Sequence, residues 1–563
     1  TIFMKNLYML MATALLATAA TAATPVRKTV HRVAPKVTTP ATRSLYKAHA
    51  LSSDNVYTPT VDTLISNQPA GTLHANQYRS GVSFVNNMGY VEKDVARDGI
   101  VSHVVEAGDG KTVYIYNPLC AFSTKAWIKG TRTVGDTIEV KLPQYLTHYD
   151  NPEMGDDSFL FRMRPVKNDD NQLTFVPDDD QTVKFTWRND TLAFVNTTAD
   201  SRILGMGTTA GEWGGFGDYV WQQTSFDATT IQPSSTEGKQ KYAMEYLESG
   251  QVYGRIKDVV FEGDKVYIQG MDPTLPEAWI VGEINGKEAI FKGDQYLGID
   301  PKSETFRFFE PAAVNRVEFG EGEDDYYLEV TGLADEMTLT YNADTKSLSS
   351  EDVMLINQGK NALNALYTYE EPDFSPWQEK AIKPAAVTEL AYDRYDESVG
   401  YGVIRFIPYE YAYNEETEDY DRLLDTRNMY YNIYIDDQLY AFTPDQYFGL
   451  DKVMTDIPFD YSDQLDFVIY GGQYNIMTHF KNEVKYIGVQ VVYNVAGQQL
   501  KSDIAYIGGD GNEINPDDVQ GINQTTISLD KGNNVLYDLT GRRVVRPVKG
   551  GIYINANGKK LVK

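Results

Sequence analysis

Hydrophobic and polar residues alternate with a period of two along much of the chain. In TIEVKL, residues 137–142, the apolar side chains of Ile138, Val140 and Leu142 would share one face of an extended segment. The segment VKFTW, residues 183–187, repeats this alternation. A period of two is the pattern of a strand with one buried and one exposed face, so these segments predict β-strands.

Turn signals separate such segments at the spacing of hairpins. Two of them are GDG at residues 108–110 and NG at residues 285–286, and both favour tight turns between antiparallel strands. We find no long amphipathic helical pattern between residues 56 and 371. The chain also contains 40 Tyr and 23 Phe, which suit half-buried strands better than helices. The sequence therefore predicts an all-β protein.

A long internal repeat organises this β region. The segment VYIYNPLCAFSTKAWIKG, residues 113–130, returns as VYIQGMDPTLPEAWIVG, residues 266–282. The offset stays nearly constant over about 85 residues, which predicts two tandem copies of one domain, at 56–237 and 238–380, each with its own core. We expect each copy to be an antiparallel β barrel or sandwich.

The residues common to the two signatures are of the packing and turn types. They are Tyr114, Trp127 and Gly130 in the first copy, and Tyr267, Trp279 and Gly282 in the second. No acidic residue occupies a secure matching position in both signatures. We therefore interpret the repeat as a duplicated scaffold, in which the two tryptophans anchor the core, with a ligand platform as the alternative.

The region 387–508 has a different pattern, with about seven short strands, typical of an immunoglobulin or fibronectin type III sandwich. Within it, PYEYAYN carries three alternating tyrosines that would share one face of a strand. Exposed aromatic rings on a β scaffold can stack on sugar rings. The candidate binding residues are Tyr409, Tyr411, Tyr413, Tyr430 and Tyr434. The alternative is that this face packs against another sheet.

The first 23 residues have the features of a signal peptide. Lys5 provides the positive charge, LYMLMATALLATAATAA the apolar core, and ATAA a small-residue cleavage site. Residues 24–55 are basic and rich in Pro and Thr, as in a linker. No later segment has the roughly 20 apolar residues that a membrane-spanning helix needs. We expect a secreted protein without a transmembrane segment.

Charge and cysteine content exclude several classes of function. A net charge of -28 disfavours nucleic-acid partners, which require a basic face. Cys120 is the only cysteine, so no internal disulfide is expected. We find no H-E-x-x-H, no G-x-S-x-G and no P-loop. The sequence thus predicts neither catalytic residues nor a metal site; calcium at the acidic loops 178–180 and 510–518 is the one cofactor left open.

The C-terminal segment 533–563 follows a linker at 509–532 and reads NNVLYDLTGRRVVRPVKGGIYINANGKKLVK. It resembles the C-terminal sorting domain of type IX secretion system cargo. The matching positions include Tyr537, Asp538, Gly541, Arg542, Gly550, Tyr553, Gly558 and Lys559. The resemblance implies a small β tail, recognition by the type IX secretion machinery and a location at the outer cell surface. The Pro-Asn-Pro segment often found upstream is replaced by GINQTTISLD.

These patterns together predict a secreted cell-surface protein with a noncatalytic binding or adhesion role and a glycan or a host or cell-surface ligand. The first alternative is a glycan-degrading enzyme or its accessory subunit, because 79 Asp and Glu residues leave room for a catalytic pair of carboxylates. The second alternative is a structural surface or stalk protein. A pocket with facing carboxylates would favour the enzyme, and an exposed aromatic strip would favour the binder.

Overall fold

A computed structural model describes most of the chain from residue 57 to residue 514. It omits 88–89, 149–156, 169–170, 196–201, 249, 319–325, 398–399, 448, 464 and 482, and it adds only four strands near the C-terminus. The expected signal peptide, the basic linker and most of the 509–532 linker lie outside the described residues. Within the described part, the only helical element is a 3-10 turn at Thr426–Asn428. The prediction of an all-β protein is confirmed.

Twelve strands are described in the first copy. They are β1 (Thr72–Asn87), β2 (Tyr90–Glu106), β3 (Thr112–Tyr116), β4 (Trp127–Arg132), β5 (Thr137–Lys141), β6 (Gln144–Thr147), β7 (Ser158–Lys167), β8 (Leu173–Pro177), β9 (Thr182–Arg188), β10 (Thr191–Val195), β11 (Ile203–Thr208) and β12 (Trp213–Ser225). Eight of them pair in the closed antiparallel ring β1-β2-β3-β4-β5-β9-β10-β12, in which β12 returns to β1. The other four extend outward from β12 through β11 and β7, which also pairs with β6 and β8.

The second copy repeats this topology strand for strand. Its elements are β13 (Gln240–Glu248), β14 (Gln251–Glu262), β15 (Lys265–Gln269), β16 (Trp279–Asn285), β17 (Glu288–Lys292), β18 (Gln295–Asp300), β19 (Thr305–Glu318), β20 (Tyr326–Leu333), β21 (Glu336–Asn342), β22 (Ser347–Ser349), β23 (Val353–Gln358) and β24 (Ala365–Pro376). Each pairing of the first copy has its counterpart here, including the closure of β13 on β24. Both copies are therefore closed barrels with a sheet extension.

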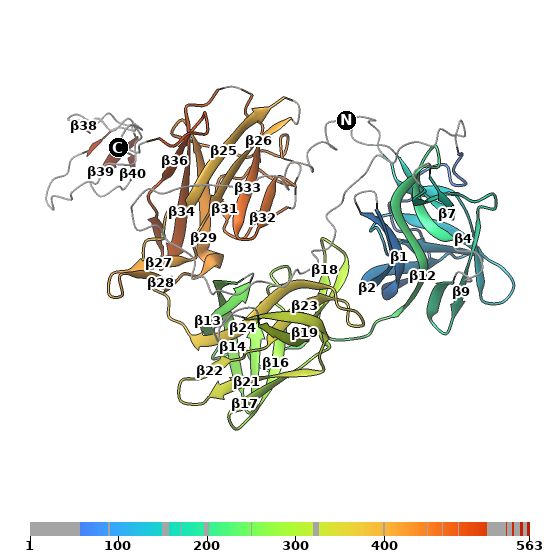
Figure 1. Cartoon of the computed structure of the whole chain (residues 1–563), viewed down its shortest axis with the longest axis horizontal. Helices are drawn as coiled ribbons and strands as arrows, with labels where there is room; N and C mark the ends of the chain where they lie inside the picture. The colour runs from blue at the N-terminus through green and yellow to red at the C-terminus, as the bar shows by residue number, and fades with distance from the viewer. Residues whose placement is uncertain are drawn as a thin grey trace.

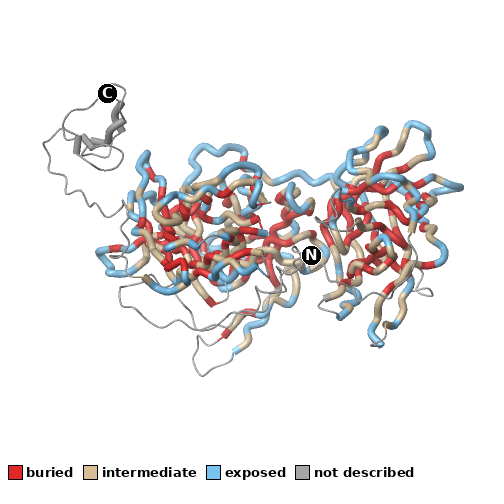
Figure 2. The backbone as a smooth tube through the Cα atoms, turned by 90° about the horizontal axis from the view of Figure 1, so that it is seen from above, coloured by how far each residue is buried: buried red, intermediate tan, exposed pale blue. Residues whose placement is uncertain are grey.

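Each barrel is filled by its own inward-facing side chains. In copy 1, Ile138, Val140, Phe185 and Trp221 are part of one buried cluster. The buried residues of the two copies form separate clusters. Figure 2 shows buried residues, in red, running through the interior of the chain under an exposed surface. Alternation along strands such as β5 places apolar side chains inside and polar ones outside, which explains why a period-two sequence closes into a barrel.

The third domain is made of two packed sheets. Its strands are β25 (Thr388–Asp396), β26 (Tyr401–Ile407), β27 (Tyr411–Asn414), β28 (Asp419–Leu423), β29 (Met429–Ile435), β30 (Gln438–Leu439), β31 (Ile457–Pro458), β32 (Phe467–Tyr470), β33 (Gln473–Thr478), β34 (Tyr486–Val495), β35 (Gln498–Lys501) and β36 (Ala505–Gly508). One sheet has the order β25-β26-β33-β32 and the other β30-β29-β34-β35, with β36 also on β34 and β31 on β29. The strands of both sheets make up the orange domain of Figure 1. Side chains of both sheets, among them Phe406 and Tyr431, share one core.

Four short strands are described in the C-terminal tail: β37 (Leu536–Tyr537), β38 (Arg543–Val544), β39 (Ile552–Asn555) and β40 (Lys560–Val562). They form one sheet in the order β38-β37-β39-β40. Tyr537 and Tyr553 lie in strands of this sheet. The other predicted sorting residues, Asp538, Gly541, Arg542, Gly550, Gly558 and Lys559, lie outside the described residues.

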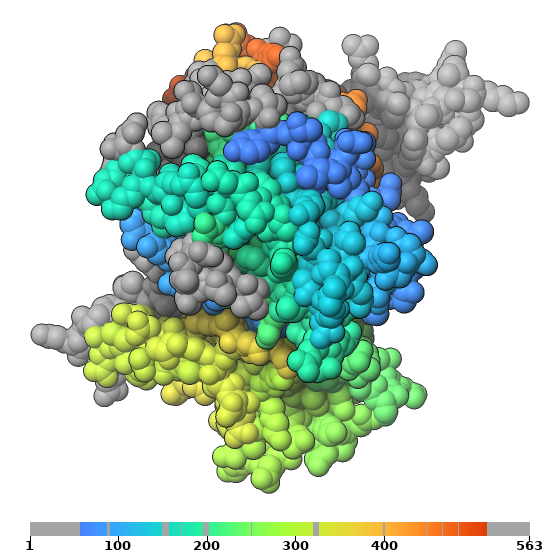
Figure 3. Space-filling model, turned by 90° about the vertical axis from the view of Figure 1, so that its right-hand side faces the viewer, coloured from blue at the N-terminus to red at the C-terminus, as the bar shows by residue number. Residues whose placement is uncertain are grey.

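The two barrels meet through a close backbone contact. Ile100 of β2 pairs with Thr305 of β19, which joins the sheets of both copies. Beside this pair, a Cβ on Gly99 would lie 2.4 Å from the backbone nitrogen of Gly359, and both glycines have positive φ angles, 66° and 76°. Only glycine allows this approach and this backbone conformation together. Figure 3 shows copy 1, in blue and teal, seated against copy 2, in green and yellow.

A buried carboxylate holds the same junction. Asp98 is 2% exposed, and its Oδ2 accepts hydrogen bonds from the N–H groups of Lys360 at 2.8 Å and Asn361 at 2.7 Å. The Tyr78 hydroxyl donates to the same oxygen at 2.5 Å. The two backbone donors come from copy 2, whereas Tyr78 belongs to copy 1 with Asp98. Separating the barrels would cost free energy, because the buried carboxyl group and both backbone donors would lose their partners. The barrels are therefore fixed relative to each other.

Candidate functional site

The repeat-signature residues lie in packing contacts. Trp127 and Trp279 are 4% and 2% exposed, and each belongs to a small buried cluster separate from its main barrel core. Tyr267 is buried in one of these clusters, and Tyr114 packs against the other. The side chains of both tryptophans are therefore too buried to serve as open ligand platforms.

The two signature glycines face large side chains of the next strand. A Cβ on Gly130 would lie 2.7 Å from the Ile138 side chain, and a Cβ on Gly282 would lie 2.5 Å from the ring of Phe291. Real Cβ atoms are not found this close to other heavy atoms, so both positions need glycine for packing. The signature thus repeats because the same barrel wall repeats.

The predicted tyrosine face does not form an exposed strip. Tyr409 and Tyr411 are each 2% exposed, because this segment of the third domain packs on copy 2. The Tyr411 hydroxyl donates to the Glu245 carboxylate of β13 at 2.8 Å. Tyr413, in contrast, is 41% exposed. The prediction of one exposed face is corrected: docking of the domains covers two of its three rings.

The remaining two candidate tyrosines lie on β29 and are half-buried. The Tyr434 hydroxyl donates to Gln490 Oε1 at 3.2 Å, and the hydroxyl of Tyr430 accepts a hydrogen bond from the Gln499 amide. Their polar ends are therefore engaged within the third domain.

A cavity of about 240 Å³ lies in copy 2 beside its junction with copy 1. It is lined by Gly293, Asp294, Glu310, Leu333, Ala334, Asp335, Lys360 and Asn361. These residues come from the turns after β17, β20 and β23 and from the middle of β19. Another hollow, of about 310 Å³, is lined only by the hairpin 494–499 and has no ionisable side chain. The cavity in copy 2 is therefore the stronger site.

Glu310 is the buried acid of this cavity. It is 3% exposed, and its Oε2 accepts the backbone N–H of Asp294 at 2.7 Å. Its other oxygen, Oε1, has no hydrogen-bond partner within the described part of the chain. Asp294 also pairs with the Lys360 ammonium group, Oδ2 to Nζ at 3.3 Å. A buried carboxylate oxygen without a partner costs free energy, so this position is built at the expense of stability.

The surroundings of Glu310 weaken its acidity. Burial raises the pKa of its carboxyl group to about 7, and the negative charge of Asp294 adds to this effect. The Asp294 N–H bond and the Lys360 charge act in the opposite direction and are outweighed. The carboxyl group consequently exchanges its proton near neutral pH, which is unusual for a glutamate and is typical of functional sites.

The corresponding place in copy 1 is filled. The strand registers put Phe161 of β7 at the position that Glu310 occupies in β19. The ring of Tyr57 packs edge-on against Phe161 with 5.2 Å between centroids. A Cβ on Gly211 would lie 2.6 Å from this Tyr57 ring and 2.7 Å from Pro177. The same structural position is thus an apolar plug in copy 1 and a polar cavity in copy 2.

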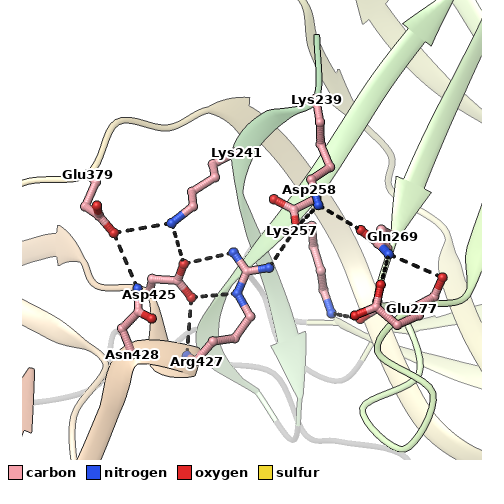
Figure 4. Close-up of polar contacts among 11 residues, drawn as sticks. Lys239, Lys241, Lys257, Asp258, Gln269, Glu277, Glu379, Asp425, Arg427 and Asn428 are labelled. Carbon is pink, nitrogen blue, oxygen red and sulfur yellow. Dashed lines mark hydrogen bonds and ion pairs between the residues drawn. The ribbon is translucent and has the colours of Figure 1, made fainter. Parts of the chain in front are cut away.

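A second polar cluster joins copy 2 to the third domain (Figure 4). The buried Asp425 accepts from Lys241 Nζ at 3.0 Å and from Arg427 Nε at 2.8 Å. Arg427 also reaches Asp258 of β14, Nη1 to Oδ2 at 3.0 Å. Burial acts to raise the pKa of Asp425, but hydrogen bonds from Arg427 and Lys241 lower it overall. The cluster is an ion-pair network that fixes the second junction.

Lys257 lies next to this network and is 7% exposed. Its Nζ donates to the carbonyl oxygen of Gly270. Burial lowers the pKa of Lys257 to about 7, and the positive charges of Arg255 and Arg427 contribute. Burial and the two cations outweigh the opposing negative charges of Asp460 and Asp272, so the neutral form of this lysine is favoured far more than in an ordinary lysine.

The described residues contain no group of three or more His, Cys, Asp or Glu side chains placed to hold a metal ion. Asp178 at the predicted calcium loop instead pairs with Arg162, Oδ2 to Nε at 3.6 Å, and with Arg202.

In the part of the chain that the structure covers, we find no helix with the length and apolar character needed to cross a membrane.

Comparison of the chain with protein-family models, curated proteins and solved structures finds no match.

Sequence reasoning missed Glu310. The repeat alone gives an imprecise signal: with the copies aligned by the QYL triplets at 144 and 295, Glu310 falls opposite Phe159. Only the strand registers of the structure identify Phe161 as its counterpart. A change from Phe to Glu at one position of a duplicated scaffold indicates that the glutamate has a role other than packing.

Proposed function

We propose that this chain is a secreted outer-surface protein that acts by noncatalytic binding, with a glycan ligand held at the cavity around Glu310. The observation that carries the proposal is the contrast between the copies at one structural position. Copy 1 fills it with Tyr57 and Phe161, whereas copy 2 keeps a cavity with a buried, incompletely bonded carboxylate. Such a group is unfavourable for folding and is expected to be retained for a ligand.

Fixed junctions support a binding role for the whole array. Asp98 joins the two barrels, and Asp425 joins copy 2 to the third domain. A site on a rigid scaffold loses little conformational entropy when it binds, which favours recognition of extended surface ligands.

We also propose export through the type IX secretion machinery. The support is the resemblance of the segment 533–563 to the sorting domain of such cargo, together with the signal-peptide pattern of residues 1–23. The proposal is tested by fusing 533–563 to a periplasmic reporter in a bacterium that has this system; reporter that stays in the periplasm would argue against it.

For the third domain we propose an immunoglobulin-like sandwich. The support is its strand order: β25-β26-β33-β32 corresponds to the A-B-E-D sheet and β30-β29-β34 with β36 to the C′-C-F-G sheet.

The main proposal is tested on a glycan array with the full chain, while released sugars are measured in the same wells. Retention of a glycan without release, lost in Glu310→Gln and kept in the exposed control Glu283→Gln, is the expected result. Retention that is equal in both variants would move the binding site away from the cavity.

A specific observation also favours the glycan-degrading enzyme as a second candidate. Glu310, with its raised pKa, accepts the backbone N–H of Asp294, and the negative charge of Asp294 acts on it. Glycosidases use a pair of carboxyl groups, of which one has a raised pKa. Released sugar that disappears in Glu310→Gln would establish this candidate and refute the noncatalytic proposal. The structural stalk protein is favoured only by the fixed junctions. An array that shows neither glycan retention nor sugar release would favour this third candidate.

A further inference from the structure

The cavity around Glu310 is rich in hydrogen-bond acceptors. Three carboxylates, those of Asp294, Glu310 and Asp335, line it together with the single ammonium group of Lys360, and that ammonium is already paired with Asp294. The site therefore carries an excess of negative charge. An occupant that brings positive charge would gain from it, whereas an anion would be repelled.

Most backbone N–H groups that line the cavity already donate hydrogen bonds within the protein. They are the N–H groups of Gly293, Asp294, Ala334, Lys360 and Asn361. The side-chain amide of Asn361 also donates, to Asp98 Oδ1 at 3.2 Å. A ligand that needs donors from the protein, such as a carboxylate or phosphate, would find few of them here. A ligand that supplies donors of its own would find acceptors.

The acceptors do not suit a bare divalent cation. Calcium takes six to eight oxygen ligands, and within the described residues no three carboxylate, His or Cys groups are placed to hold a metal. An ammonium group needs only three acceptors and carries its charge with its donors. Glu310, whose Oε1 has no partner in the described chain, is the natural counter-ion.

From this donor and acceptor balance we infer that the cavity recognises a primary ammonium group, presented by a glycan that contains free amino sugars. The inference rests on the proposed function and specifies its ligand class. Glu310 would supply the charge-assisted contact, and the exposed Asp335 would strengthen the field around it. Neutral and N-acetylated sugars lack the positive charge, so they would leave the Glu310 carboxylate uncompensated.

The experiment uses isothermal titration of the full chain at pH 7 with three tetrasaccharides of the same β-1,4 backbone. One carries a free amine at carbon 2 (a glucosamine tetramer), one an acetamide, and one a hydroxyl group (cellotetraose). We expect the amine form to bind at least about tenfold more tightly than either other form, as a charge-assisted contact implies. Equal affinity for all three would overturn the inference but leave glycan binding intact, and binding of none would overturn both.

Two variants and a control localise the effect. Glu310→Gln keeps the size of the side chain and should weaken amine binding about tenfold or more. Asp335→Asn changes an exposed residue and should weaken amine binding about threefold through the lost charge. Glu283→Gln removes the same charge from an exposed position on β16 and should leave binding unchanged. Equal binding by the parent chain and all three variants would refute the assignment.

Two further measurements vary the pH and the type of molecule that carries the ammonium group. At pH 5.5 a carboxyl group with a pKa of about 7 is almost fully protonated, so amine binding should fall about tenfold relative to pH 7. Tighter binding at pH 5.5 would contradict the inference. Tetralysine offers the same ammonium group on a peptide; if it binds and the amino-sugar tetramer does not, a glycan source is refuted.

Discussion

Replacing Glu310 by Gln should make the protein more stable above neutral pH. The folded state raises the pKa of this carboxyl group from 4.5 to about 7, so between these pH values the folded chain binds a proton that the unfolded chain has released. Stability therefore falls as pH rises through this interval and stays reduced above it. The amide of Gln carries no charge and can still accept the Asp294 N–H bond, so the variant avoids the loss.

The magnitude follows from the same interval. At about 1.4 kcal/mol per pH unit, a displacement from 4.5 to about 7 corresponds to about 3 kcal/mol of lost stability at pH 8. We expect Glu310→Gln to recover about 2–3 kcal/mol at pH 8 and close to nothing at pH 4, where the parent carboxyl group is already neutral in both states.

Hydrogen exchange measured by mass spectrometry is the suitable assay, because peptides from β17 to β19 cover the strands around Glu310. Peptides from β5 to β7 of copy 1 serve as the internal control, and Glu283→Gln controls for the change in net charge. A variant that is no more stable than the parent at pH 8, or that gains equally at pH 4 and pH 8, would falsify the reasoning about a buried, incompletely bonded carboxylate.

Three further outcomes are expected. Lys257→Met should stabilise the chain by a few kcal/mol at pH 6, and this advantage should fade between pH 7 and 10.5. The reason is that the folded pKa of about 7 makes the stability of the parent chain rise with pH over that range. Denaturant titrations at three pH values would check this, and an advantage that does not change with pH would contradict it. Gly359→Ala should lower the free energy of unfolding by more than about 2 kcal/mol and loosen the barrel junction, since the added Cβ would clash with Asp98 and the φ angle of Gly359 is positive. Unchanged amide hydrogen exchange at β2 and β23 would contradict this prediction. Trp279→Ala should cost about 3–5 kcal/mol, as for a buried aromatic residue, in copy 2 only; a loss spread equally over both copies would oppose separate cores.

The sequence was sufficient for the local and the repeated features of this protein. Ile138 and Val140 alternate with polar residues, and both are fully buried in the barrel. The tandem copies were also predictable, because residues 113–130 and 266–282 encode the same strand pair. These features depend on backbone geometry between near neighbours, where the pleat alone sends alternate side chains to opposite faces.

The tertiary structure decided which of those faces meets another domain. Tyr409 and Tyr411 look like an open aromatic face in sequence, yet docking on copy 2 buries both. On β19, Phe309 packs in the core of copy 2 and Phe308 packs against copy 1. Both faces of this strand are therefore buried, which is why its consecutive apolar residues do not alternate with polar ones. Glu310 follows directly in that run, and its character as a cavity acid depends on turns distant in the sequence. Alternation fixes the face of each side chain, but the partner that covers that face is set by contacts between distant segments, which no local pattern encodes.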